Sequence, residues 1–327
     1  MKLQEMPRFG VVGSNFITDK MMAALSALEA PVVSIFSRTE ERGREYAARF
    51  GIPGVYTDYT AFLNSGIDAV YIATPNYIHS EMTDAALRAG VHVLVEKPAA
   101  ISQREFLASS ALARERGLVL MEAMRPLHDP FSEKIKELLP RIGRLRRAVI
   151  DFCQYSSRYD SFLQGDIKNA FRPELGNAAL MDIGVYCIAL SAFFFGQPTS
   201  VSSHSVFLHN GMEGEGSAIL GYDGFNVDIK YSKIADSCFP SYFQGECGTL
   251  SFDHPVSPRV LTLALRNGIR EEILLTPPEN NMVCELADFC RLVGENPEER
   301  TDRYTEYTLT ALSVMDKIRA QNGICFS

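Results

Sequence analysis

The chain has 327 residues, which is enough for about two domains of ordinary size. Its 32 Lys and Arg residues against 40 Asp and Glu residues give a formal net charge of −8, and a chain this acidic is a poor partner for nucleic acid. Two cores of ordinary size need neither disulfides nor a structural metal, and the one short basic run, Arg141 to Arg147, is interpreted as a solvated surface.

The first third of the chain alternates short apolar runs with segments of helical periodicity. Strands are predicted at residues 9–12, 32–36, 69–73, 91–95 and 118–121, and helices at 19–28, 40–50, 80–89 and 103–116. Gly51, Gly90 and Gly117 follow three of these helices, where a left-handed C-cap is expected. Strands that alternate with helices of this length predict β-α-β units, and their unbroken apolar character indicates a parallel sheet covered on both faces.

After residue 125 the predicted strands follow one another with few helices between them. Strands are predicted at residues 145–155, 199–208, 217–222, 226–231, 249–252, 260–265 and 270–275, and helices at 177–195, 281–292 and 301–321. This pattern indicates an open, largely antiparallel sheet. The predicted fold class is therefore α/β, with an N-terminal Rossmann parallel sheet and a C-terminal α/β domain that has an open, mostly antiparallel sheet.

The predicted division places a Rossmann dinucleotide-binding domain at residues 1–125. A substrate and oligomerisation domain with the open sheet is expected at residues 126–300, and a C-terminal helix at 301–327 is expected to pack back on the first domain.

Membrane, export and metal signals are weak. No apolar stretch reaches the ~18–20 residues that cross a bilayer, and the best candidate, residues 183–195, is predicted to be a buried helix. The N-terminus has no secretory cleavage pattern. Seven cysteines without a C-x-x-C pair, together with scattered histidines, predict reduced thiols, a cytoplasmic location and no metal site.

A modified phosphate-binding loop follows the first predicted strand. Gly13, Asn15 and Thr18 fill the three positions of a G-x-G-x-x-G motif. Backbone N–H groups and the positive end of the next helix can face a pyrophosphate there. Asparagine tolerates positive φ but is larger than glycine, so the pyrophosphate either sits further out or is bound by the Asn15 amide. The residues expected to form this loop are Gly13, Ser14, Asn15, Phe16 and Ile17.

The end of the second predicted strand indicates which dinucleotide binds. An acidic residue at this place would hold the ribose 2′-hydroxyl of NAD, but Ser37 and Arg38 stand here instead. Arginine makes forked, charge-assisted hydrogen bonds to phosphate, which favours NADP over NAD. The alternative is that Arg38 only stacks on adenine, which either cofactor permits.

Three further motifs coincide with strand and helix ends. Thr74-Pro75-Asn76 and His79 follow the strand at 69–73, and Glu96-Lys97-Pro98 ends the strand at 91–95. The run from Gly176 to Tyr186, which contains Asp182-Ile183-Gly184-Val185-Tyr186, opens the long helix of the second half. Together with the first loop, these motifs resemble the glucose–fructose oxidoreductase/inositol dehydrogenase/rhizopine-catabolism family (Gfo/Idh/MocA) over essentially the whole chain.

The resemblance implies a cofactor lying across the carboxyl ends of the parallel strands, with Lys97 between nicotinamide and substrate. The further residues expected to bind the cofactor are Ala73, Thr74, Pro75, Asn76, His79, Glu96, Lys97 and Arg172. Many members have His where this chain has Tyr186, which resembles the branch of glucose–fructose oxidoreductase and the dimeric dihydrodiol dehydrogenases. Gly176-Asn177-Ala178 replaces three glycines and Phe171-Arg172 replaces Trp-Arg, so the substrate is left open.

The chemistry of hydride transfer supports three catalytic candidates. The oxygen on the reacting carbon must lose or gain a proton while the nicotinamide carries the hydride. An ammonium near a phenol favours the tyrosinate, so Tyr186 is the expected acid/base and Lys97 the electrostatic stabiliser. Asp182, four residues before Tyr186, is expected on the same helix face as a substrate-orienting carboxylate.

Each candidate also has a structural alternative. Lys97 alone could be a surface lysine, Tyr186 a core tyrosine and Asp182 a carboxylate that interacts with the helix dipole. His79 either caps the helix that starts near Ser80 or contacts the cofactor.

The predicted function is an NAD(P)-dependent oxidoreductase, a dehydrogenase or reductase acting on CH–OH groups of a sugar, cyclitol or diol. The alternative is a catalytically silent dinucleotide-binding regulator on the same fold. Family members associate through the second-domain sheet, so a homodimer or tetramer is expected, with no nucleic-acid or membrane partner.

Overall fold

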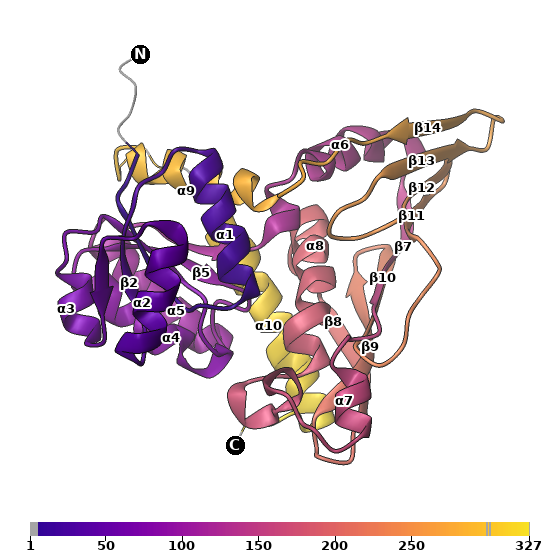
Figure 1. The fold of residues 1–327 in the computed structure, drawn as a ribbon. Coiled ribbons are helices and arrows are strands. Elements are labelled where there is room, and N and C mark those ends of the chain that lie inside the picture. Colours follow the sequence, from indigo (N-terminus) through magenta and orange to yellow (C-terminus); the bar gives the residue numbers. More distant parts are fainter. Residues whose placement is uncertain (1–5, 299, 301, 327) are drawn as a thin grey trace. The chain divides into compact units, whose positions relative to one another are not determined.

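The computed structural model describes residues 6–298, 300 and 302–326, and it divides into two compact units (Figure 1). Unit 1 comprises Met1–Arg125 with Pro278–Glu306, and unit 2 comprises Pro126–Pro277 with Tyr307–Ser327.

Unit 1 is built on a six-stranded parallel sheet in the order β3-β2-β1-β4-β5-β6. Its strands are β1 (Phe9–Val12), β2 (Val32–Phe36), β3 (Gly54–Tyr56), β4 (Ala69–Ile72), β5 (His92–Glu96) and β6 (Leu120–Ala123). Its helices are α1 (Phe16–Ala27), α2 (Glu40–Phe50), α3 (Tyr59–Leu63), α4 (His79–Arg88), α5 (Gln103–Glu115) and α9 (Met282–Gly294). The predicted Rossmann sheet is confirmed. Among the described strands and α-helices of unit 1, the sequence analysis missed the short β3 and α3, of three and five residues.

The strand order of unit 1 creates a switch point between β1 and β4. From β1 the chain adds β2 and β3 on one side, and it then crosses to add β4, β5 and β6 on the other. In open α/β sheets, ligands bind outside the carboxyl ends of the strands at such a point. The loops after β1 and β4 are therefore the first place to look for a nucleotide site.

Helix α9 belongs to unit 1, which differs from the predicted boundary of the second domain. Its side chains Met282, Leu286 and Phe289 are fully buried in the core of the parallel sheet. The Phe289 ring lies 5.9 Å from the ring of Phe9 on β1. The chain returns to this core after the open sheet because the apolar face of α9 completes it, and local periodicity does not reveal that return.

Unit 2 is built on an eight-stranded sheet in the order β14-β13-β12-β11-β7-β10-β9-β8. Its strands are β7 (Leu145–Cys153), β8 (Ser200–Phe207), β9 (Glu213–Tyr222), β10 (Phe225–Ser232), β11 (Ser241–Gly245), β12 (Gly248–Phe252), β13 (Val260–Leu265) and β14 (Arg270–Leu274). Among the described residues of this sheet, β7 and β10 are the one pair of strands that run in parallel. The predicted open, mostly antiparallel sheet is confirmed, although β11 was not predicted.

The helices of unit 2 are α6 (Pro130–Leu138), α7 (Tyr159–Leu163) and α8 (Val185–Phe195), and α10 (Tyr304–Asn322) enters it from Tyr307 onward. The Tyr307 ring lies 5.2 Å from that of Phe193 on α8. Gln321 donates a hydrogen bond to the carbonyl of Val201 on β8. From Tyr307 onward this helix packs within unit 2, and its packing on the first domain stays a prediction. Residues 301 and 327 of the predicted segment lie outside the described residues.

Helix α8 packs against β7 and β10 (Figure 1). Within the described residues, the helical stretch Pro173–Phe195 is long and apolar enough to cross a membrane by length and composition, which is longer than the stretch considered in the sequence. Because 83% of its most apolar window is buried inside the structure, it is accounted for as a core helix, as predicted for residues 183–195.

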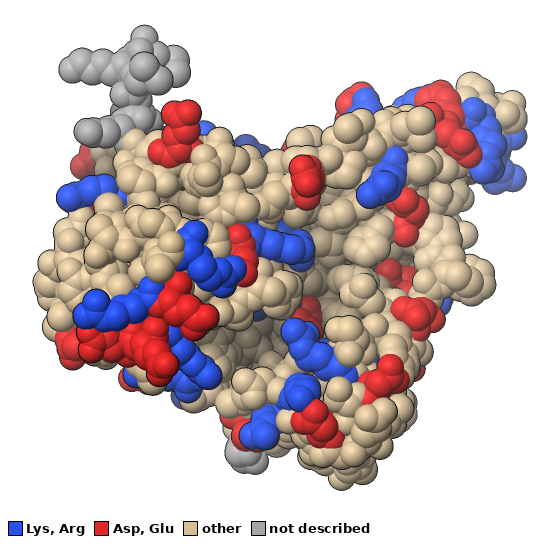
Figure 2. All heavy atoms as spheres, in the orientation of Figure 1, with Lys and Arg blue, Asp and Glu red and all other residues tan. Residues whose placement is uncertain are grey.

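The basic run at the start of β7 is paired with acidic side chains. Arg141 pairs with Glu271 at 2.6 Å, and Arg147 pairs with Asp228 on β10 at 2.5 Å. Figure 2 shows basic and acidic side chains interspersed on the face it draws. These pairs support the interpretation of the run as a solvated surface.

Candidate functional site

The loop after β1 approaches the end of β4 closely, and Gly13 makes that approach possible. Gly13 has φ +108°, a conformation that side chains other than glycine rarely adopt. A Cβ atom at this position would lie 2.5 Å from the carbonyl oxygen of Ala73. A larger residue would therefore push apart the two loops at the switch point.

Asn15 has a different role from the one expected for the second glycine position. Its φ is −107°, so no positive φ is needed there. The side-chain oxygen accepts hydrogen bonds from the N–H groups of Ile17 (2.9 Å) and Thr18 (3.2 Å), while the side-chain nitrogen donates to Ala73 (3.1 Å). Asn15 is thus the N-cap of α1 and a link between β1 and β4.

The predicted 2′-phosphate residues directly follow β2. The N–H of Ser37 donates to the carbonyl of Tyr56 on β3 at 3.0 Å, which fixes the backbone at this strand end. Arg38 is exposed, one residue beyond it. Because β2 pairs in parallel with β1, both residues lie at the same edge of the sheet as the phosphate loop. This placement fits an adenosine phosphate beside the loop.

His79 ties the loop after β4 to the loop after β5. Its ring is fully buried, with Nε2 2.8 Å from the Thr74 carbonyl oxygen and Nδ1 2.8 Å from that of Pro98. Burial lowers the pKa of His79, and the two carbonyl oxygens oppose that shift. Helix α4 has Ile78 as its N-cap without a side-chain cap hydrogen bond, so the helix-capping alternative for His79 is wrong.

The Glu-Lys-Pro motif is braced by both neighbouring strands. The buried Glu96 carboxylate accepts a 2.6 Å hydrogen bond from the Tyr71 hydroxyl on β4. The Glu122 carboxylate, on β6, accepts a hydrogen bond from the N–H of Ala99 at 2.9 Å. Burial raises the pKa of Glu96. Half-buried Lys97, between these anchored residues, is held at the carboxyl edge of the sheet.

A third buried carboxyl group, Glu285 of α9, was not predicted. Neither of its oxygens has a hydrogen-bond partner among the described residues. Burial raises the pKa of Glu285 well above its usual range, and nearby Glu96 and Glu122 act in the same direction. The group is therefore favoured in its protonated form. Its only sequence signal is a glutamate on the apolar face of a helix.

In unit 2, Asp182 and Tyr186 do not share one α-helix, contrary to the prediction of a continuous helix at 177–195. Asp182 lies in a π-helical turn, Leu180–Gly184, and Tyr186 lies in the first turn of α8. The Asp182 side chain is 42% exposed, whereas Tyr186 is only 6% exposed and its ring lies 5.9 Å from that of Phe152. The wide turn gives the two side chains different surroundings. Such turns are frequent at functional sites.

Two residues on the neighbouring strands β9 and β10 hold the π turn in place. A Cβ atom at Gly184 would lie 3.0 Å from ring carbons of Tyr231 on β10, so glycine allows the turn to sit on this ring. The buried Glu213 carboxylate accepts hydrogen bonds from the N–H of Leu180 (2.7 Å) and the hydroxyl of Tyr231 (2.8 Å). Glu213 thereby fixes the start of the turn.

Lys233, just after β10, was also missed by the sequence analysis. Its ammonium pairs with the Asp182 carboxylate at 2.8 Å. A single lysine after a strand carries no local signal of such a contact. Arg172 is exposed, donates to the carbonyl of Ile167 at 3.3 Å and lies 3.9 Å from Glu174.

The structure thus brings the predicted residues together in two groups. In unit 1 the residues after β1, β2, β4 and β5 lie along one edge of the parallel sheet. In unit 2 Asp182 lies in the π turn, and Tyr186 lies in α8, the helix that directly follows this turn. Among the described residues, no group of three or more His, Cys, Asp or Glu side chains is arranged to hold a metal ion.

The parallel sheet, its loop at the switch point and the attached open-sheet unit define a dinucleotide-dependent oxidoreductase fold. Residues 7–124 match the oxidoreductase family with an NAD-binding Rossmann fold, and residues 133–250 match the GFO/IDH/MocA C-terminal domain. The chain therefore belongs to the Gfo/Idh/MocA family and is an NAD(P)-dependent oxidoreductase.

Three relatives illustrate the range of the family. The chain is 39% identical to scyllo-inositol 2-dehydrogenase (NADP(+)) IolU of Bacillus subtilis, over 98% of each protein. It is 29% identical to trans-1,2-dihydrobenzene-1,2-diol dehydrogenase of Mus musculus, over 81% of this chain and 79% of that protein. The crystal structure of KijD10, a 3-ketoreductase from Actinomadura kijaniata in complex with NADP and TDP-benzene, matches with a TM-score of 0.83 and 27% identity, over 97% of this chain and 98% of that one.

Proposed function

We propose that this chain is an NADP-dependent dehydrogenase or reductase of a sugar, cyclitol or diol, with a cyclitol as the first substrate to test. The observation that carries the proposal is the pair of intact chemical groups, Lys97 in a braced strand-end loop and Tyr186 in the first turn of α8, directly after the turn that carries Asp182. The identity to IolU over nearly the full length supports a cyclitol.

The preference for NADP over NAD rests on Ser37 and Arg38. An exposed guanidinium at the carboxyl end of β2 supplies forked donors for a 2′-phosphate. The residues of the phosphate loop (Gly13, Ser14, Asn15, Phe16 and Ile17) are proposed to hold the pyrophosphate. Those after β4 and β5 (Ala73, Thr74, Pro75, Asn76, His79, Glu96 and Lys97), with Arg172 of unit 2, are proposed to hold the nicotinamide half. Among them, fully buried His79 is proposed to act by positioning the two loops.

The catalytic roles follow from what the reacting oxygen needs. When bound, the nicotinamide accepts or donates the hydride. Tyr186 is the proton carrier for the hydroxyl or carbonyl oxygen of the substrate. Lys97 donates a hydrogen bond to that oxygen and stabilises its negative charge. Asp182 accepts a hydrogen bond from a second substrate hydroxyl and orients the ring.

Nicotinamide absorbance, measured with NADP or NADPH and a panel of cyclitols, sugars, diols and their keto forms, tests this proposal. We expect turnover with at least one polyol and a higher kcat/KM with NADP than with NAD. The rival hypothesis of a silent dinucleotide-binding regulator predicts tight NADPH binding without turnover of any member of the panel. That outcome would contradict the proposal.

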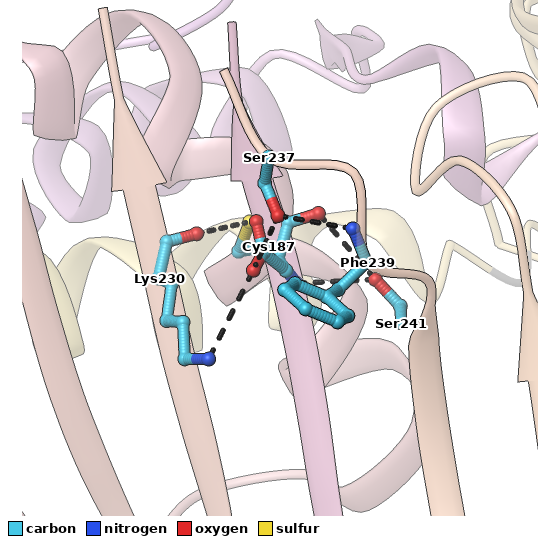
Figure 3. A network of polar contacts seen from close by, with 6 residues as sticks. Cys187, Lys230, Ser237, Phe239 and Ser241 are labelled. Atoms are coloured by element: carbon cyan, nitrogen blue, oxygen red, sulfur yellow. Dashed lines mark hydrogen bonds and ion pairs between the residues drawn. The ribbon is translucent and has the colours of Figure 1, made fainter. Parts of the chain in front are cut away.

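We also propose that the chain forms a homodimer or tetramer through the uncovered face of the unit 2 sheet. Figure 3 shows a network of polar contacts at the middle of this sheet, in which Lys230, Ser237 and Ser241 each contact Asp151 on β7. Ser237 donates to the buried Asp151 carboxylate at 3.1 Å, while the neighbouring Phe239 is 71% exposed. The side chain of Ile219 on β9 is also exposed, and a shallow cavity of about 390 Å³ lies over β12 and β13 of the same sheet. Exposed apolar surface of this kind marks association sites.

Light scattering after size exclusion tests this association, with a Phe239→Asp, Ile219→Asp variant as the comparison. The wild type is expected at twice or four times the mass of one chain and the variant at the mass of one. A wild-type monomer would contradict the proposal. A cytoplasmic location is proposed as well, supported by seven cysteines that are all free.

A further inference from the structure

Lys233 is a buried lysine in unit 2 that the proposed chemistry does not yet use. It directly follows β10, and its side chain is only 2% exposed. Its backbone N–H donates to the carbonyl of Gly214 on β9 at 2.9 Å, so the position is fixed by the sheet. Lysine is almost never fully buried unless its charge is paired. The partners of the ammonium therefore indicate why it is there.

The ammonium has three partners from two other segments. It pairs with the Asp182 carboxylate at 2.8 Å and donates to the carbonyl of Ala170 at 3.0 Å. It also lies 5.0 Å from the ring centroid of Phe171, within the range of a cation–π contact. The ion pair, the hydrogen bond and the ring face leave the buried charge well compensated.

These contacts place the lysine between a core and an exposed surface. Buried Lys233 forms an ion pair with the Asp182 carboxylate, yet the Asp182 side chain is still 42% exposed. The same ammonium anchors the turn Asn169–Phe171, which leads directly to exposed Arg172. One buried charge thus fixes both the carboxylate and the segment where the chain departs from its family pattern.

We propose that Lys233 is a positioning residue for substrate recognition, which holds the Asp182 carboxylate so that it accepts a hydrogen bond from a hydroxyl of a polyhydroxylated substrate. This inference rests on the proposed function. Lys233 itself does not touch the substrate. Its removal leaves the π turn in place, because Glu213 holds the start of that turn independently. The carboxylate and the turn at Asn169–Phe171 would lose their common anchor.

A double-mutant cycle separates this role from a merely structural one. We expect Lys233→Met to raise the KM for the cyclitol about tenfold or more, and to change kcat and the NADPH Kd less. In an Asp182→Asn background the same substitution is expected to raise KM less than twofold, because the oriented carboxylate is already gone. Equal increases in both backgrounds would overturn the inference.

Lys134→Met is the matched control, because Lys134 makes an exposed ion pair with Glu137 in the same unit and should leave KM unchanged. If Lys233→Met does not fold, Lys233→Arg is measured instead. The arginine keeps the positive charge but places it differently from the lysine ammonium. We therefore expect a rise in KM smaller than tenfold, and an unchanged KM overturns the inference. An inactive wild type overturns the proposed function itself. If the wild type is active but Lys233→Met raises KM equally with and without Asp182→Asn, only the role of Lys233 is overturned.

Discussion

The two units place their functional groups by different means. In unit 1 the groups stand in loops after parallel strands, and main-chain contacts hold them, as where Gly13 meets Ala73 and His79 meets Pro98. In unit 2 they stand on a π turn and the start of the helix after it, and the turn is held by two buried ionisable side chains, Glu213 of β9 and Lys233 just after β10. Sheet topology is enough to place the first group, whereas the second depends on side chains that are distant in the sequence.

This difference predicts that substitutions in the two units will separate kinetically. Changes in the unit 1 loops, with the exception of Lys97, should weaken cofactor binding. Changes on the unit 2 turn should reduce turnover or substrate affinity while cofactor binding stays intact. The variants below test that separation.

The largest expected effect is on turnover in unit 2. Tyr186→Phe removes the proposed proton carrier, and loss of a positioned acid/base typically costs ~10²–10⁴ in rate. We expect kcat to fall by that factor while the NADPH Kd, measured by nicotinamide fluorescence, stays unchanged. The control is Tyr222→Phe, which removes a phenol that bonds to Ser191 on α8 and to the Gly196 carbonyl beyond the helix. Unchanged turnover in Tyr186→Phe would remove Tyr186 from the mechanism.

The next effect is on stability and cofactor binding in unit 1. Gly13→Ala combines an unfavourable φ with a backbone collision against Ala73, and we expect a loss of ~2–4 kcal/mol in stability together with weaker NADPH binding. Gly51→Ala is the control, because Gly51 has φ +69° but a Cβ atom there would meet no other atom within 4 Å. Thermal unfolding and NADPH titration measure both. Equal losses in the two variants would mean that the close approach at Gly13 is unimportant.

A smaller effect is expected on cofactor choice. Arg38→Ala should weaken NADPH binding by ~10-fold or more, since hydrogen bonds to charged groups contribute ~1.5–3 kcal/mol, and leave NADH binding nearly unchanged. Arg44→Ala, which breaks only an exposed pair with Glu40 on α2, is the control. Equal weakening of NADPH and NADH would mean that Arg38 only stacks on adenine.

The smallest effect concerns pH and stability in unit 1. Burial, with help from Arg300, lowers the pKa of His92 to about 4, and its Nδ1 accepts a hydrogen bond from the N–H of Val119. Between the ordinary histidine pKa of ~6.5 and the folded value, only the unfolded chain binds the proton, so acidification destabilises the fold. Since the ring keeps some solvent contact, we expect the His92 contribution lost between pH 7 and pH 4 to be on the order of 1–2 kcal/mol.

Chemical unfolding of wild type and His92→Gln at both pH values isolates this contribution, because other groups titrate in both proteins. The wild type should lose more stability on acidification than the variant. An identical pH dependence in the two would show that His92 does not titrate as described.

The sequence predicted the fold well because its strongest signals are local. The predicted apolar strands and helices of unit 1 are confirmed to within three residues at each end, and the carboxyl-end rule placed Gly13, Ser37 and Lys97 at one edge. Short elements such as β3 and β11 were missed, since three to five residues carry little periodicity.

The missed site residues share a physical reason. Tyr71, Glu213 and Lys233 act through partners that are distant in the chain, for example Lys233 with Asp182. A buried polar residue needs a partner, but the sequence does not say which one. The π turn was missed for the same reason. The sequence shows Gly184 as part of a motif, but it does not show that this glycine packs on the ring of Tyr231, which lies on β10.

The central claim is that Lys97 and Tyr186 act on the same reacting oxygen of a substrate oxidised by NADP. The most direct test is single-turnover hydride transfer, followed by nicotinamide absorbance, in wild type, Lys97→Met, Tyr186→Phe and the double variant. Groups that work as one unit are strongly non-additive. We therefore predict that the double variant is about as slow as the slower single variant. Rate losses that multiply, or single variants as fast as the wild type, would contradict the account.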